Sequence, residues 1–178
     1  MFGLRRMFLH SPWFFMLLLG CSSEPESVLP VAGTNRGSER EAQRLYREAQ
    51  AAEQSGRVKK AINRYTETAN KHPNSSVAPL ARFQQAQLLE RRGDLDKAFE
   101  TYQMVITRYQ ASSLYSKARD HQAQVAHAAA DGQISSSFLW FKPEIDTKKV
   151  VSMLETVRDN APRSPSAAKA QYAIGKAY

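Results

Sequence analysis

The sequence predicts an all-α solenoid of stacked helix pairs, and three observations lead to that prediction. One block of residues recurs along the chain at a fixed spacing, the recurring blocks are rich in residues that favour helices, and glycine falls where each pair must turn. Such a unit cannot bury its apolar face alone, so successive units are expected to stack into a solenoid.

The repeat is clearest in the block GRVKKA, Gly56–Ala61, which returns as GDLDKA, Gly93–Ala98, at an offset of 37 residues. Tyr65 and Tyr102 share this offset, and Leu154 follows Tyr65 at an offset of 89, which is fifteen more than two repeats. Further pairs at the offset of 37 are Tyr46 and Phe83, Ala49 and Ala86, Ala81 and Ala118, and Gln85 and Gln122. A third unit with a fifteen-residue insertion explains both offsets.

These matches divide residues 41–178 into units of about 41–74, 75–111 and 112–162, with an insertion at 131–145 and a partial unit at 163–178. Small residues such as Ala61 allow the two helices of a unit to approach closely. Val150 takes that position in the third unit, so its helices are expected to lie further apart. A generic helical bundle is the alternative, but it gives no reason for a constant phase of these residues.

The partial unit supplies a first helix with an apolar stripe that includes Tyr172. Either this helix caps the array or the chain is part of a longer protein, and the stripe favours the second interpretation.

The pattern G-x-x-x-x-A-x-x-x-Y…P, here Gly56, Ala61, Tyr65 and Pro73, resembles the tetratricopeptide repeat. The second unit departs from it with Gln110 at the proline position. The resemblance implies helix-turn-helix units whose first helices line a concave face.

The N-terminus has the features of a cleaved secretory signal peptide over residues 1–20. Arg5 and Arg6 precede an apolar stretch, and its uninterrupted part, residues 13–19, is too short to span a bilayer, which takes roughly 20 residues. The next residue is Cys21, the sole cysteine of the chain, which cannot form an internal disulfide.

The sequence LLGC at residues 18–21 resembles a bacterial lipobox, which implies that Cys21 carries acyl chains such as palmitate. An ordinary signal peptide with a chance cysteine is the alternative. By the same resemblance, Ser22 and Ser23 in place of aspartate favour the outer membrane, with the mature chain in the periplasm. Residues 21–40 then form the lipidated cysteine and a flexible tether.

Composition and motifs argue against catalysis, metal binding and cofactors. Without the two arginines of the signal peptide, the formal net charge falls from +8 to +6, which suits anionic lipid or acidic protein partners. An exported protein does not meet nucleic acid. His121 and His127 lie six residues apart, so they do not form an i, i+4 zinc pair, and Asp94 and Asp96 flank a helix start, where carboxylates serve as caps. We therefore predict that the chain is not an enzyme and has no small-molecule substrate.

Matching positions on the first helices predict a peptide-binding groove. The candidate groove residues are Tyr46, Phe83 and Asp120 and, one turn later, Gln50, Gln87 and Gln124. The glutamine amides both donate and accept, as the backbone of an extended peptide requires, and the aromatic rings suit an apolar side chain. The alternative is that glutamine is a good helix former on a solvated face.

The insertion carries four consecutive large apolar residues, Phe138, Leu139, Trp140 and Phe141. They predict a partner-docking loop, because tryptophan is enriched among interface anchors. Packing of these rings into the gap of the third unit is the favoured alternative, since exposure of four apolar side chains promotes aggregation.

The combination of lipobox and repeats resembles the BamD family of outer-membrane lipoproteins. This resemblance implies a non-catalytic scaffold in β-barrel outer-membrane protein assembly, with β-barrel assembly proteins and unfolded outer-membrane proteins as partners. Pilotin-type pilus-assembly lipoproteins and Tol-Pal-associated repeat proteins are the alternative scaffolds, and an envelope hydrolase with its catalytic part elsewhere is the alternative of another class.

Overall fold

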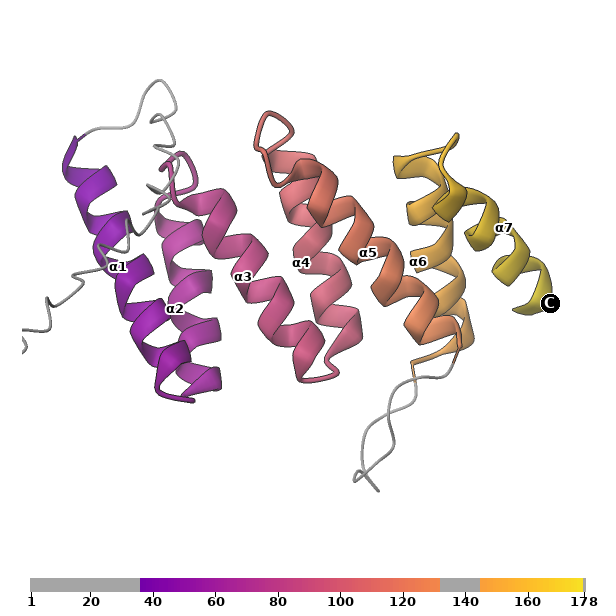
Figure 1. The fold of residues 1–178 in the computed structure, drawn as a ribbon, viewed down its shortest axis with the longest axis horizontal. Coiled ribbons are helices and arrows are strands. Elements are labelled where there is room, and N and C mark those ends of the chain that lie inside the picture. The colour runs from indigo at the N-terminus through magenta and orange to yellow at the C-terminus, as the bar shows by residue number, and fades with distance from the viewer. Residues whose placement is uncertain (1–35, 132–144, 178) are drawn as a thin grey trace, which may run out of the picture.

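A computed structural model describes residues 36–131 and 145–177, which form seven helices and no strand (Figure 1). The helices are α1 (Arg36–Gln54), α2 (Val58–Lys71), α3 (Ala78–Arg91), α4 (Leu95–Arg108), α5 (Tyr115–Ala130), α6 (Thr147–Asn160) and α7 (Pro165–Ala177). Cys21 and the tetrad Phe138 to Phe141 lie outside the described residues, so their predicted roles stay predictions.

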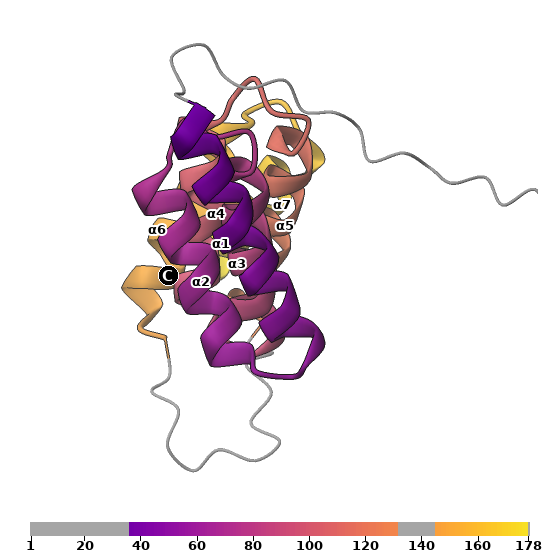
Figure 2. The ribbon, with the colours of Figure 1, turned by 90° about the vertical axis from the view of Figure 1, so that its left-hand side faces the viewer.

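The helices stack in chain order, each against the next, so that α1 with α2, α3 with α4 and α5 with α6 form successive pairs (Figure 1). Viewed along the array, α6 lies toward one side, and α5 and α7 toward the other (Figure 2). The predicted all-α solenoid is confirmed. The first helices of successive units also contact one another, because Glu53 of α1 pairs with Arg91 of α3 and Glu90 of α3 lies 3.2 Å from His121 of α5. Their matching residues therefore follow one another along the array.

Small and large residues alternate in the core as the repeat requires. Ala49, Ala61, Ala86 and Ala98 are fully buried, and a methyl group at each position lets the paired helices approach closely. Tyr65, Tyr102 and Leu154 are the corresponding large side chains of the three units, and each is at most 1% exposed. The ring of Tyr65 packs on Tyr46 of α1, and the ring of Tyr102 packs on Phe83 of α3 and His121 of α5.

Glycine ends the first helix in units one and two because the backbone must turn in the left-handed region. Gly56 and Gly93 have φ values of 70° and 73°, which cost little only for glycine. The amide nitrogens of Arg57 and Asp94 donate to the carbonyls of Ala52 and Leu89, at 2.9 Å in both turns. Identical turns give the first two units the same internal geometry.

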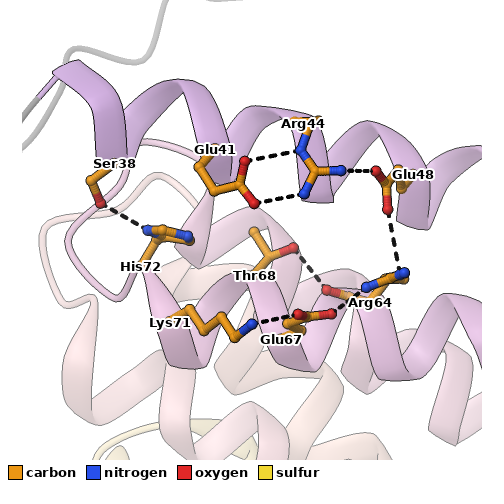
Figure 3. A network of polar contacts seen from close by, with 9 residues as sticks. All are labelled: Ser38, Glu41, Arg44, Glu48, Arg64, Glu67, Thr68, Lys71 and His72. Atoms are coloured by element: carbon orange, nitrogen blue, oxygen red, sulfur yellow. Dashed lines mark hydrogen bonds and ion pairs between the residues drawn. The ribbon is translucent and has the colours of Figure 1, made fainter.

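Helix α1 begins at Arg36, so the prediction of a flexible tether through residue 40 is wrong for its last five residues. Two side chains of the first turn are held by residues at the end of α2 and in the connection that follows it. Ser38 Oγ lies 2.8 Å from His72 Nδ1 (Figure 3), and Glu39 accepts hydrogen bonds from the backbone nitrogen and hydroxyl of Ser76. These contacts order a segment whose composition alone resembles a linker.

A chain of ion pairs runs over the surface of α1 and α2 (Figure 3). Arg44 joins Glu41 and Glu48, and Arg64 joins Glu48 to Glu67, which also binds Lys71. The hydrogen bond from Arg44 lowers the pKa of Glu41, and those from Lys71 and Arg64 lower the pKa of Glu67. The α1–α2 pair is the first of the described array, so no other described pair packs on its outer side. A polar, charged surface suits this position.

The third unit is packed differently, as its sequence predicts. Helices α5 and α6 pack less extensively on each other than the helices of the other two pairs do, in line with Val150 at the position of the small alanine. Three amides connect this region instead. Gln122 donates to Gln103 at 2.6 Å, and Asn160 donates to Gln103 and Gln122 at 2.8 Å each, so α4, α5 and α6 meet in one polar cluster.

None of the helices between residues 36 and 177 that the structure describes is both long and apolar enough to cross a membrane.

Candidate functional site

The candidate site is the face formed by α1, α3 and α5, which we call the amide face after the three glutamines that it presents. Gln50 and Gln124 are exposed and Gln87 is half-buried. Within the described ranges, no hydrogen bond joins any of these three amides to another side chain. Their donors and acceptors are therefore available to a bound polypeptide backbone.

The two aromatic residues predicted for this face have different surroundings. Tyr46 is half-buried, with its ring centroid 5.5 Å from that of Tyr65. Phe83 is only 6% exposed, because the rings of Tyr102 and His121 lie 5.6 and 5.5 Å from it. The prediction of Phe83 as a groove residue is therefore corrected: its ring belongs to the core between α3, α4 and α5.

The position of His121 explains this difference. The residue at the same position in α3 is Gln84, at the offset of 37, so Tyr46 has no second ring over it. Tyr46 is thus the one of the two predicted aromatics that keeps part of its surface for a ligand. The third position of the series, Asp120, is exposed on α5.

Asp120 lines a hollow of about 30 Å³ at the junction of α5, α6 and α7, together with Gln122 and Asn160 of the amide cluster. This is the space of about one water molecule. A carboxylate here gives the third unit an acidic character where the first unit has an aromatic ring.

Two glutamates that the sequence analysis did not single out fix the geometry of the amide face. Glu53 of α1 accepts a 2.8 Å hydrogen bond from Tyr65 and pairs with Arg91 of α3 at 2.6 Å. Glu90 of α3 accepts from Tyr102 at 2.6 Å and lies 3.2 Å from His121 Nδ1 of α5. Each glutamate joins the second helix of its own unit to the first helix of the next.

Burial raises the pKa of Tyr65 and of Tyr102, and the hydrogen bonds to Glu53 and Glu90 raise it further. Both hydroxyls therefore stay protonated and donate at physiological pH. The sequence contained a signal for these tyrosine–glutamate hydrogen bonds, because the two glutamates and the two tyrosines are each separated by 37 residues. Recognising it required knowing that the side chains at these positions meet.

The amide face offers the three glutamine amides and part of the ring of Tyr46. Beside them, the carboxylates of Glu53 and Glu90 accept hydrogen bonds from the buried tyrosines and hold the helices together. This combination suits recognition of a polypeptide. Within residues 36–131 and 145–177, no group of three or more histidine, cysteine, aspartate or glutamate side chains is placed to hold a metal ion.

Comparison with known families gives a match to a tetratricopeptide repeat over residues 46–113, which run from within α1 to the connection after α4. No match to a curated protein was found. Tetratricopeptide repeats generally serve as scaffolds for protein–protein interaction. Residues 46–113 carry this repeat, and the described helices form an all-α tetratricopeptide-repeat solenoid.

Proposed function

We propose that this protein is a non-catalytic scaffold that binds extended polypeptide on its amide face. The observation that carries the proposal is the regular series Gln50, Gln87 and Gln124, one amide on the first helix of each unit. Extended chains expose backbone donors and acceptors at regular intervals, and a series of amides along a solenoid is a suitable partner for them.

We further propose that the scaffold acts at the outer membrane, held by lipid on Cys21 with its helices in the periplasm, in a BamD-like role. The supporting features are the lipobox-like residues 18–21, the absence of aspartate after Cys21 and the repeat fold. In this role the amide face receives segments of unfolded β-barrel proteins, which are extended and rich in aromatic residues. Tyr46, which is half-buried, offers such segments part of its ring.

The peptide-binding proposal is tested with the triple variant Gln50→Ala, Gln87→Ala and Gln124→Ala. We expect its affinity for a fluorescent peptide from an outer-membrane β-strand to fall about tenfold, a loss of about 1.4 kcal/mol. Gln110→Ala is the matched control, because Gln110 is exposed in the α4–α5 connection and away from the series. Unchanged affinity of the triple variant, with an intact helical circular dichroism signal, would rule out the amide face as the binding surface.

The anchoring proposal is tested with Cys21→Ser. The unchanged chain should incorporate labelled palmitate and fractionate with outer membranes, whereas the variant should lose both properties. A chain that remains in the membrane fraction without lipid would contradict the proposal.

Purification of the lipidated protein from envelopes in mild detergent separates the proposed role from its alternatives. Recovery of a large β-barrel assembly protein with other assembly lipoproteins supports the BamD-like role. Recovery of pilus secretin subunits, or of Tol-Pal components without the barrel machinery, would replace it with the pilotin-type or Tol-Pal-associated role.

A further inference from the structure

A second groove lies between α2 and α4, with α3 as its floor, and we call it the intervening groove. Its volume is about 540 Å³, within the usual range of about 300–1,000 Å³ for ligand sites. The lining residues are Lys59, Ile62 and Asn63 of α2, Gln85, Leu89 and Arg92 on or next to α3, and Asp94, Lys97, Glu100, Thr101 and Met104 on or next to α4. Its walls are second helices, whereas the amide face belongs to the first helices.

The groove has an apolar strip that reaches solvent. Ile62 and Leu89 are 8% and 5% exposed, and Met104 is 40% exposed. Met104 is one of two large apolar side chains that the described part of the chain leaves exposed. A methionine at a groove wall adapts to partner side chains of different shape.

The charged residues of the groove leave two lysines without an acidic partner. Asp94 lies 3.5 Å from Arg92, and Glu100 lies 2.8 Å from Lys149 of α6, so both acids are paired. Lys59 on one wall and Lys97 on the other make no ion pair with any residue that the structure describes. The groove therefore carries uncompensated positive charge on both sides of its apolar strip.

The next boundary along the array shows what is missing here. Lys149 holds the same repeat position in α6 that Lys97 holds in α4, and it binds Asp96 at 2.9 Å and Glu100 at 2.8 Å. These hydrogen bonds raise the pKa of Lys149. In α2 the residues at the positions of Asp96 and Glu100 are Lys59 and Asn63. Lys97 thus faces a lysine and an amide where Lys149 faces two carboxylates.

We propose that the intervening groove binds an acidic and aliphatic segment of a partner protein. A carboxylate of the segment pairs with Lys59 and Lys97, replacing the acids that α2 lacks, and an adjacent aliphatic side chain packs on Ile62, Leu89 and Met104. The exposed amide of Asn63 serves the peptide backbone. This site lies outside the amide face, and the inference does not depend on the function proposed for that face.

The test compares two fluorescent peptides by anisotropy, one of alternating glutamate and leucine and one in which glutamine replaces each glutamate. We expect the acidic peptide to bind the full chain about tenfold more tightly at low salt, and high salt to reduce the difference. The variant Lys59→Asp with Asn63→Glu gives α2 the acids of α4, so Lys97 becomes paired and the preference should disappear. Lys60→Glu is the control, since Lys60 is exposed on the same helix but does not line the groove.

Equal binding of the two peptides would overturn the proposal, and so would a preference that survives the double variant. Loss of acidic-peptide binding in the triple glutamine variant, with the Lys59 and Asn63 variant unaffected, would assign the peptide to the amide face instead. Phosphatidylglycerol vesicles provide a further arm: if they bind through Lys59 and Lys97 and the acidic peptide does not, the groove is a lipid site and the proposal fails. Unchanged circular dichroism shows that each variant is folded.

Discussion

Units one and two differ from unit three in how they are held together, although all three follow one repeat. In the first two, a buried tyrosine donates to a glutamate of the first helix, as Tyr65 does to Glu53 and Tyr102 to Glu90. In the third, Leu154 and His127 occupy the corresponding positions, so no such bond forms. The amide cluster of Gln103, Gln122 and Asn160 joins the helices there instead.

The difference shows that the repeat keeps the phase of the buried positions more strictly than the chemistry of the residues that occupy them. A large side chain stays buried at the position of Tyr65, Tyr102 and Leu154, whereas the polar partner changes from glutamate to His127 in unit three. A buried hydrogen bond contributes to stability only when both partners are present, so tyrosine and glutamate are lost together. Unit three replaces them with an apolar side chain and a new polar cluster.

The largest effect on this comparison is expected from Tyr102→Ala. Tyr102 is fully buried, and truncation leaves a cavity between α3, α4 and α5, with an expected loss of roughly 3–5 kcal/mol in the free energy of unfolding. Tyr102→Phe keeps the ring and removes only the bond to Glu90, for a loss of about 1 kcal/mol. Urea denaturation measures both. Equal losses in the two variants would mean that the hydroxyl, and not the ring, stabilises unit two.

The second effect is expected from Gln122→Leu in the amide cluster. The half-buried Gln103 and Asn160 lose their hydrogen bonds to the buried Gln122, which should cost roughly 1–3 kcal/mol of unfolding free energy. Gln124→Leu, on the same helix but exposed, should change it by less than about 0.5 kcal/mol. If the two variants are equally stable, the cluster does not hold α4, α5 and α6 together.

A smaller, pH-dependent effect is expected from His127, which replaces the glutamate in unit three. Burial lowers the pKa of His127 below its ordinary value, and the charge of Lys169 acts in the same direction. The unfolded chain therefore binds the proton more readily, so stability is present above the ordinary histidine pKa and is lost as the pH falls toward the lowered one. Unfolding free energy should decline between about pH 7 and pH 5.

His127→Leu supplies the check, because it removes the titrating group and keeps an apolar side chain of similar bulk. Its unfolding free energy should decline less over the same pH range than that of the unchanged protein. Parallel declines would show that another group is responsible.

The smallest effect is expected from Lys149→Ala at the boundary between units two and three. The side chains of Lys149, Asp96 and Glu100 are about half exposed, and ion pairs in such positions contribute about 0.2–1 kcal/mol. The loss should shrink at high salt, and Lys148→Ala should show no comparable loss. A salt-independent loss would point to packing of the lysine stem instead of charge.

Much of the fold and part of the site were predictable from local patterns. The repeat of 37 residues, the turn at Gly56 and the looser third pair all follow from residue type and spacing. In a helix, the spacing of residues along the chain determines on which face each side chain lies. The amides of the first helices were predictable for the same reason. The burial of Phe83 was not, because it depends on His121, a residue of the next unit.

The sequence by itself determined the helix pairs, their order and the phase of the core, since each unit encodes its own turn and apolar positions. Only the tertiary structure decided which side chains meet across unit boundaries. It joined Glu53 to Arg91 and Glu90 to His121, ordered residues 36–40 through Glu39 and Ser76, and left Lys97 without the acids that Lys149 has. These contacts join residues of different units, and their distances depend on how neighbouring pairs rotate against each other, which no repeat pattern specifies.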